Sequence, residues 1–418
     1  LSRLVVLAGH APLASTNQAL LPRLAAGSSM TVMFSTRALM FSSRTSSRSS
    51  ISFFSSAARS RHLQSSSACI SLGHSRGLLP RGASISAAMS ALSFPMLEGS
   101  TFVSVDDCLE ALQASVSSSS VGTGTATHDG PKLVFVDGSW YHRGDRNGRL
   151  EFEDGPRVAG ARHIDMDDIA AHPDLFPDLN PKGLPQMLPP ARLFAAFMDE
   201  CGIANSDHVI IYGKDGCVFT PRIWFLFRSM GHDPSKIHLM QGPFEEWEAK
   251  GGSVESGRTM VPQAADLDLG REPSYRPADA KNVVGMEDIL EVLDEGRSMA
   301  EGDTLILDPR GSTFSRGHMP GAIHIPYSSL VERDNALKFK PKEELLRIFQ
   351  DAGVAANTDK RIICSCGSGV SACHLVAALE ECGRDVWSDD RKTVIYDGSW
   401  AEFGFDPEVP DKYRVSSE

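Results

Sequence analysis

Acidic residues are missing from the first 97 positions of this 418-residue chain, in which Glu98 is the first Asp or Glu. The same stretch holds nine arginines and 24 serines, most densely in residues 41–67. An Arg-rich, Ser-rich and acid-free segment is typical of an organelle targeting peptide. A low-complexity tail without a targeting function is the alternative that the composition leaves open. We therefore expect residues 1–97 to be a disordered transit peptide for a mitochondrion or, alternatively, for a plastid.

Positive charge is scarce in the rest of the chain. Nine of the 41 Lys and Arg lie in the leader, so 32 remain against all 53 Asp and Glu, a formal net charge of −21. Such an acidic body lacks the basic surface that binds nucleic acids. No apolar run reaches the roughly 18 residues that a membrane-spanning helix needs. We expect neither a nucleic acid nor a membrane among the partners.

The eight cysteines lack the regular spacing of a disulfide framework, and paired C-x-x-C zinc knuckles are absent. The glycines at 367 and 369 do not form the G-x-G-x-x-G pattern of a dinucleotide site. We therefore expect no metal and no cofactor. Four of the eight cysteines fall within residues 364–382, and this concentration needs a physical reason.

Two parts of the chain repeat the same blocks in the same order. The first part runs LVFVDGSWY (133–141), VAGARHIDM (158–166), VIIYGKDG (209–216) and HLMQGPFEEW (238–247), and the second runs LILDPRGST (305–313), MPGAIHIPY (319–327), RIICSCGSG (361–369) and VIYDGSWAEF (394–403). Similar offsets, 171 residues between Asp137 and Asp308 and 156 between Gly242 and Gly398, indicate one duplicated domain with insertions in the first copy.

Each copy alternates short apolar runs with helical patterns such as 221–230 and 371–382. This alternation predicts an α/β fold with two tandem domains, each a parallel sheet covered by helices on both faces. We place the first domain at 98–250, a polar, Pro/Gly-rich linker at 251–283 and the second domain at 284–418. A Ser/Gly/Thr run at 115–127 predicts a loop insertion in the first domain.

The most informative segment is RIICSCGSGVSACH, residues 361–374, in which a strand ends at Cys364 and a helix begins near Ala372. Two glycines let the loop bend so that its N–H groups converge, and the helix N-terminus behind adds free donors and its dipole. A sulfur at the front of these donors is favoured as a thiolate. Cys366 is therefore a candidate nucleophile that can attack sulfur and carry a persulfide. A buried structural cysteine is the alternative.

The duplicated domains, with CGSGVSACH (366–374) and YDGSWAEF (396–403), resemble the two-domain rhodanese-like sulfurtransferases, most of all their 3-mercaptopyruvate branch. The resemblance covers the chain from about residue 102 onward. It implies that Cys366 is the persulfide-carrying nucleophile of a catalytic second domain. It also implies a small-molecule sulfur donor and a thiol or cyanide acceptor, such as a thioredoxin-like dithiol. The implied amide cradle comprises Gly367, Ser368, Gly369, Val370 and Ser371.

The residues after the cysteine bear on the choice of sulfur donor. The thiosulfate-preferring branch that this sequence resembles carries basic residues there, whereas this loop has neutral Gly367 and Ser368. A neutral loop suits a keto-acid thiol with one carboxylate, so we expect 3-mercaptopyruvate rather than thiosulfate. Ser368 is a catalytic candidate that hydrogen-bonds the donor and assists proton movement, with a backbone-capping serine as the alternative. A thiosulfate sulfurtransferase and a non-catalytic binding module remain alternative functions.

Two arginines that clamp the substrate carboxylate are also implied by the resemblance. The corresponding segment 308–321 is shortened here, and Arg310 and Arg316 are its only arginines. Either guanidinium can bind a carboxylate through two hydrogen bonds, so both are predicted substrate-binding residues. Arg316 as an ordinary surface arginine is the alternative.

A Ser–His–Asp relay implied by the resemblance is incomplete in this sequence. Its acid matches Asp167, but its histidine position holds Gln186, and a glutamine does not transfer a proton as imidazole does. The mechanism therefore does not depend on this relay.

In the first copy the cysteine position is expected at Lys214–Asp215, so this domain is predicted to be non-catalytic, and Cys217 to be structural. Cys364 is assigned to core packing, with a redox role beside Cys366 as the alternative. A cysteine phosphatase would need an arginine to close the loop, and the sixth residue after Cys366 is Ala372. That enzyme class is therefore disfavoured.

Overall fold

The computed structural model describes residues 94–119, 130–142, 144, 146–299, 301–388 and 390–416. The predicted targeting segment therefore lies outside the described residues, except for its last four positions. Those positions belong to the fold, because Phe94 and Leu97 are fully buried in the core of the first domain. The predicted boundary at residue 97 was wrong by at least four residues, since two apolar side chains at this point fill the core.

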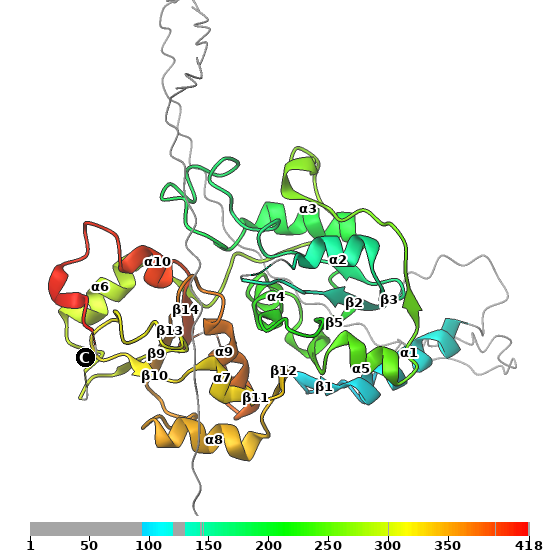
Figure 1. Ribbon diagram of the computed structural model, residues 1–418. Coiled ribbons are helices and arrows are strands. Elements are labelled where there is room, and N and C mark those ends of the chain that lie inside the picture. The colour runs from blue at the N-terminus through cyan, green and yellow to red at the C-terminus, as the bar shows by residue number, and fades with distance from the viewer. Residues whose placement is uncertain are drawn as a thin grey trace, which may run out of the picture. The chain divides into compact units, whose positions relative to one another are not determined.

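The first domain, drawn in cyan and green in Figure 1, is built on a five-stranded parallel sheet with strand order β1-β6-β5-β2-β4. The strands are β1 (Phe102–Ser104), β2 (Leu133–Asp137), β4 (Arg162–His163), β5 (His208–Tyr212) and β6 (Ile237–Gln241). The helices are α1 (Val105–Ser119), α2 (Gly148–Asp154), α3 (Ala191–Cys201), α4 (Thr220–Ser229) and α5 (Phe244–Ala249). A short antiparallel pair joins β3 (Arg157–Val158) to β7 (Val254–Glu255).

Alternating side chains of these strands pack against helices on opposite faces of the sheet. On one face Phe135 and Ile210 pack with residues of α1 and α5. On the other face Val136 and Ile211 pack with residues of α3 and α4. The strands are therefore apolar on both sides, as expected of a parallel sheet covered by helices.

The second domain repeats this topology in the order β8-β14-β13-β9-β10. Its strands are β8 (Val283–Val284), β9 (Thr304–Asp308), β10 (Ile323–His324), β13 (Arg361–Cys364) and β14 (Thr393–Tyr396). Its helices are α6 (Met286–Asp294), α7 (Tyr327–Leu330), α8 (Lys342–Asp351), α9 (Ala372–Glu381) and α10 (Ser399–Phe403), and a small antiparallel pair links β11 (Val331–Glu332) to β12 (Asn335–Phe339). The α6 and α10 side chains cover one face of the sheet, and those of α8 and α9 cover the other. The predicted fold class is confirmed.

The two domains meet through helix α4 of the first and helix α9 of the second, whose apolar side chains share one core cluster. Arg228 of α4 lies over the rings of Trp224 and Trp387, at 4.7 and 5.7 Å from their centroids. The same guanidinium pairs with Glu380 of α9. His374 of α9 hydrogen-bonds through Nε2 to the carbonyl oxygen of Val218 at 2.7 Å. Packing and buried polar contacts together fix the interface.

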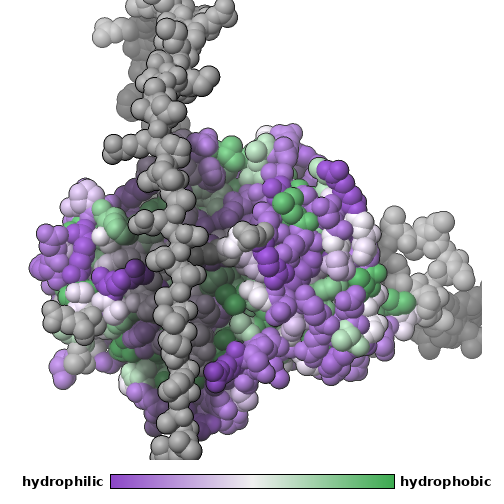
Figure 2. Space-filling view, in the orientation of Figure 1, coloured by the Kyte–Doolittle hydropathy of each residue, from purple (hydrophilic) through white to green (hydrophobic). Residues whose placement is uncertain are grey.

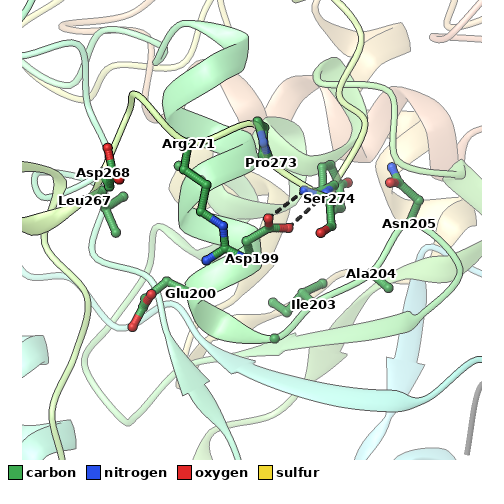
Figure 3. Close-up of a pocket in the computed structure, with 13 residues that line it drawn as sticks. Asp199, Glu200, Ile203, Ala204, Asn205, Leu267, Asp268, Arg271, Pro273 and Ser274 are labelled. Carbon is green, nitrogen blue, oxygen red and sulfur yellow. Dashed lines mark hydrogen bonds between the residues drawn. The ribbon is translucent and has the colours of Figure 1, made fainter.

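Residues 251–283, predicted as the linker, follow a defined path along the first domain. They contain β7, and Tyr275 is only 1% exposed. Asp199 of α3 accepts the N–H groups of Ser274 and Tyr275 at 2.6 and 2.8 Å, beside a cavity of about 360 Å³ (Figure 3). The predicted loop at 115–127 was wrong at its start, because residues 115–119 continue helix α1, and 120–127 lie outside the described residues.

Figure 2 shows a face whose exposed residues are mainly hydrophilic, with separate apolar patches. None of the helices in the described ranges combines the length and the apolar character that crossing a bilayer requires.

Two buried histidines predict that acid weakens the fold. Burial lowers the pKa of His238 to about 4, and also that of His374 to about 4. Between about pH 6.5 and pH 4 the unfolded chain binds protons that the folded chain does not, so stability is complete above this window and falls as the pH decreases through it. Each group contributes a slope of up to about 1.4 kcal/mol per pH unit. Urea unfolding at about pH 7 and about pH 5 measures this loss.

The variant His238→Gln keeps a donor for the carbonyl oxygen of Ser100 but no longer titrates in this window. We expect a smaller difference between its two urea midpoints than for the unaltered chain. An unchanged difference would show that the protonation of His238 does not contribute.

Candidate functional site

The loop that carries Cys366 lies at the carboxyl end of β13, directly before helix α9. In parallel α/β sheets this edge is where ligands bind. Cys366 itself is 1% exposed. Gly369 has a φ of +74°, and a Cβ there would lie 2.7 Å from an Asp397 carboxylate oxygen. The loop therefore depends on glycine at this position.

The hydroxyl of Ser399 holds the loop in shape. Ser399 Oγ accepts the N–H groups of Cys366 and Gly369 at 3.0 and 3.1 Å, and it donates to the carbonyl oxygen of Tyr396 at 2.7 Å. The carbonyl oxygen of Cys366 accepts the N–H of Trp400 at 3.0 Å. The segment that follows β14 thus holds residues 365–371, the candidate nucleophile loop, through hydrogen bonds to its backbone.

Most of the predicted cradle residues offer free amide groups. Among the residues that the structure describes, the N–H groups of Gly367, Ser368, Val370 and Ser371 donate to no protein acceptor. The N–H of Gly369 differs, because Ser399 already occupies it. Free amides at the start of a ten-residue helix form a site for negative charge. The arrangement can therefore stabilise an anionic sulfur or an anionic substrate group.

The first domain contacts this loop through a buried ion pair. Arg222 of α4 and Asp397 after β14 are 3% and 4% exposed, and their charged groups lie 2.7 Å apart. The guanidinium also donates to the carbonyl oxygens of Gly369 at 3.3 Å and of Gln186 at 2.6 Å. The second Asp397 oxygen accepts the N–H of Leu188 at 2.7 Å. One arginine thereby links α4, the Gln186 segment and the nucleophile loop.

Ser368 is hydrogen-bonded to the first domain. Its hydroxyl donates to Gln186 Oε1 at 2.9 Å, and Gln186 Nε2 donates to Asp167 Oδ1 at 2.8 Å. The other oxygen of Asp167 accepts the indole N–H of Trp140 at 2.6 Å. Ser368, Gln186 and Asp167 are therefore joined by a chain of hydrogen bonds, with the Gln186 amide where the implied relay has a histidine.

The structure places the two candidate arginines differently from each other. The Arg310 guanidinium pairs with Asp308 at 2.7 Å, donates to the carbonyl oxygen of Gly317 at 2.8 Å and lies 5.0 Å from the ring centroid of Trp400. This buried arginine is thus already paired within the fold, and its role as a carboxylate ligand stays a prediction. Arg316 is exposed, and its side chain has no hydrogen bond or ion pair with any described residue.

The shortened segment before β10 is stabilised by aromatic stacking. The ring of Phe314 lies between those of His318 and His324, at centroid distances of 4.0 and 4.3 Å. Phe314 is 8% exposed. Apolar packing thus occupies the part of this segment that lies between the two candidate arginines.

The first domain contains a counterpart of the nucleophile loop without a cysteine at its front. The N–H of Phe244 donates to the carbonyl oxygen of Gly213, as that of Trp400 does to Cys366. Gly216, with φ of +79°, matches Gly369 at the same spacing. The cysteine position is therefore Gly213, and the expected Lys214–Asp215 was wrong by one residue.

The other cysteines near the site are packing residues. Burial raises the pKa of the Cys364 thiol and that of Cys373, the latter to about 12. Cys373 donates to the carbonyl oxygen of Gly369 at 3.4 Å. Cys217 in the first domain is 1% exposed, and burial raises its pKa to about 11. These thiols stay protonated at neutral pH and are poor nucleophiles.

Sequence reasoning missed three residues of the site: Arg222, Asp397 and Ser399. All three lie in segments that the sequence analysis names, 221–230 and 396–403. Their roles depend on partners 30 to 209 positions away in the chain, so no local pattern could reveal them.

Comparison with known proteins now identifies the family. A profile of the rhodanese-like domain matches residues 293–405. The probable 3-mercaptopyruvate sulfurtransferase of Schizosaccharomyces pombe is 32% identical over 288 residues, which cover 65% of this chain and 87% of the relative. The chain belongs to the rhodanese-like sulfurtransferases.

Two further matches of this sulfurtransferase carry names of the same kind. Thiosulfate/3-mercaptopyruvate sulfurtransferase 1, mitochondrial, of Arabidopsis thaliana is 29% identical over 309 residues, covering 69% of this chain and 76% of the relative. The crystal structure of SseA from Escherichia coli, a 3-mercaptopyruvate sulfotransferase by its description, matches with a TM-score of 0.54 at 26% identity. It covers 72% of this chain and all of that one. The prediction of a sulfurtransferase is confirmed.

The described part of this sulfurtransferase has no group of three or more His, Cys, Asp or Glu side chains that could hold a metal ion.

Breaking the buried ion pair should destabilise the enzyme strongly. The variant Asp397→Asn removes the charge that faces the Arg222 guanidinium, and a buried charge without its partner costs about 3–5 kcal/mol. We expect the free energy of unfolding, measured with urea, to fall by that amount. The double variant Arg222→Met/Asp397→Asn should lose less than the sum of the two single variants. Additive losses would contradict a coupled pair.

The exposed contact between Lys250 and Asp106 provides the control. Its charged groups also lie 2.7 Å apart, but the two side chains are 36% and 73% exposed. We expect Lys250→Met to cost at most about 1 kcal/mol, since water screens exposed ion pairs.

Proposed function

We propose that this sulfurtransferase takes the sulfur of 3-mercaptopyruvate, holds it as the sulfane sulfur of a persulfide on Cys366, and passes it to a thiol or cyanide acceptor. The observation that carries the proposal is the position of Cys366, at the front of a loop in which the amide groups of residues 367, 368, 370 and 371 are free and the side chains are uncharged. Such a loop stabilises negative charge on sulfur without a basic side chain.

In the first step the Cys366 thiolate attacks the sulfur of 3-mercaptopyruvate. An S–S bond forms, the C–S bond breaks, and its electron pair stays on carbon as the enolate of pyruvate. The proton of the donor's thiol ends on that carbon. The products are pyruvate and a Cys366 persulfide anion, so atoms and charge balance without an oxidant.

In the second step an acceptor thiolate attacks the outer sulfur of the persulfide. The acceptor leaves as a persulfide, or as thiocyanate when it is cyanide, and Cys366 returns to the thiolate. A small dithiol protein of the thioredoxin-like kind is the acceptor that we propose. The amide groups of Gly367, Val370 and Ser371 stabilise the anionic sulfur in both steps.

Replacing the nucleophile tests this proposal directly. The variant Cys366→Ser should lose all turnover of 3-mercaptopyruvate, because its hydroxyl cannot carry a sulfane sulfur. The measurement is sulfide release in the presence of a thiol, with 3-mercaptopyruvate and with thiosulfate as donors. Mass spectrometry of the unaltered chain should find one added sulfur atom on the peptide that contains Cys366.

The matched control is Cys217→Ser, a change at a buried cysteine in the corresponding loop of the first domain, which should retain activity. Turnover of thiosulfate alone would agree with a persulfide mechanism but would contradict 3-mercaptopyruvate as the sulfur donor. No turnover of either donor by the folded, unaltered chain would contradict the enzyme reaction and favour a binding module.

Arg316 is the arginine of its segment that remains open to a ligand, and we propose that it binds the donor's carboxylate. The following Gly317 lies against Trp400, whose N–H binds the Cys366 carbonyl oxygen. The variant Arg316→Gln should raise the KM for 3-mercaptopyruvate about tenfold with little change in kcat, as expected for lost ground-state binding. An unchanged KM in steady-state kinetics would show that Arg316 is a surface residue.

We also propose that the enzyme acts in mitochondria. The Arg-rich, acid-free composition of residues 1–97 and the mitochondrial name of the Arabidopsis thaliana relative support this location. Microscopy of a fluorescent fusion to the whole chain tests it, and plastid fluorescence would overturn it.

A further inference from the structure

Gln186 is held in an unusual backbone conformation beside the nucleophile loop. Its φ is +52°, in the left-handed region that side chains other than glycine rarely adopt. Arg222 donates to its carbonyl oxygen at 2.6 Å, and Asp397 accepts the N–H of Leu188 two residues later. The buried ion pair therefore fixes both sides of Gln186 and directs its side chain.

Asp167 determines which way the Gln186 amide faces. A carboxylate only accepts hydrogen bonds, so the amide NH₂ group must face it, as the 2.8 Å contact from Nε2 to Oδ1 shows. The Trp140 indole N–H occupies the other carboxylate oxygen. Asp167 is thus fixed by two donors, and the flipped amide would place two acceptors in contact.

The fixed amide in turn sets the direction of the Ser368 hydroxyl. Gln186 Oε1 faces Ser368 Oγ at 2.9 Å and can only accept, so Ser368 must donate its single proton to Gln186. Toward the substrate side Ser368 then presents oxygen lone pairs alone. The amide also ends the chain, because it does not pass a proton on to Asp167.

We propose that Gln186 is a positioning residue for donor specificity: it makes Ser368 a hydrogen-bond acceptor, which favours donors that carry a sulfur-bound proton. This inference rests on the proposed function. The thiol of 3-mercaptopyruvate is protonated at neutral pH, as an ordinary thiol is, and it can donate to Ser368. Thiosulfate carries no proton and has only acceptor atoms, so the same oxygen repels it. The preference for 3-mercaptopyruvate over thiosulfate thus includes a repulsive contact with thiosulfate.

The test compares two substitutions of Gln186. Gln186→Met has a similar length but only a weakly accepting sulfur, so it frees the Ser368 hydroxyl to turn and donate. Gln186→His adds no formal charge when its ring is neutral, and it keeps one ring N–H for Asp167 and one ring nitrogen that accepts the Ser368 proton. The measurement is kcat/KM for 3-mercaptopyruvate and for thiosulfate with the full chain, together with the urea midpoint of each variant.

We expect the ratio of the two kcat/KM values, 3-mercaptopyruvate over thiosulfate, to fall about tenfold or more in Gln186→Met. Gln186→His should keep a ratio at least as high as that of the unaltered chain even where its total activity changes. Gln241→Met is the matched control, because Gln241 accepts the N–H of Phe339 at 2.7 Å in the domain interface. Its ratio should not change.

Equal losses with both donors in Gln186→Met would overturn the inference and leave a structural role. The inference is also overturned if Gln186→His loses the ratio as completely as Gln186→Met does. If the unaltered, folded chain turns over neither donor, the proposed function fails, and the inference fails with it. A changed ratio in an active enzyme supports both.

Discussion

The buried ion pair between Arg222 and Asp397 is the contact on which the rest of the site depends. It crosses from the first domain to the second, and the same guanidinium holds the carbonyl oxygens of Gly369 and Gln186. A buried pair contributes little stability compared with apolar side chains of the same size, because both charges lose their water. Its effect here is geometric, since each charge is tolerated only when the two domains meet in this arrangement.

Because the domain is duplicated, the first copy can lack the cysteine and contribute side chains to the site of the second copy. Gly213 stands in the first domain where the second has Cys366, and Pro243 stands where Ser399 holds the Cys366 loop. A Cβ at Gly213 would meet Thr220 at 3.0 Å and Cys217 at 3.3 Å, so a cysteine could not enter without displacing neighbours. Without the nucleophile the first domain is free to supply Arg222 and Gln186 to its partner.

The parts of the structure that sequence reasoning predicted are those that depend on local patterns. Strands such as β13, the helix α9 and the loop between them follow from hydrophobic runs, two glycines and a helix start. The ion pair between Arg310 and Asp308 and the packing of Phe314 between two histidines depend on the surrounding fold instead. The same holds for residues 94–97, whose burial needs the core of the first domain to exist.

The charges around Cys366 leave the loop amides as the groups that stabilise an anionic sulfur. Arg222 and Arg310 are neutralised by carboxylates within the fold, and the body outside the leader carries a net charge of −21. Such a field opposes an approaching anion in proportion to the anion's charge. A monoanion that gains free N–H groups at Cys366 is opposed about half as strongly as a dianion of similar size. The acidic body and the acceptor at Ser368 thus act in the same direction: both favour a donor with a single carboxylate and a protonated sulfur.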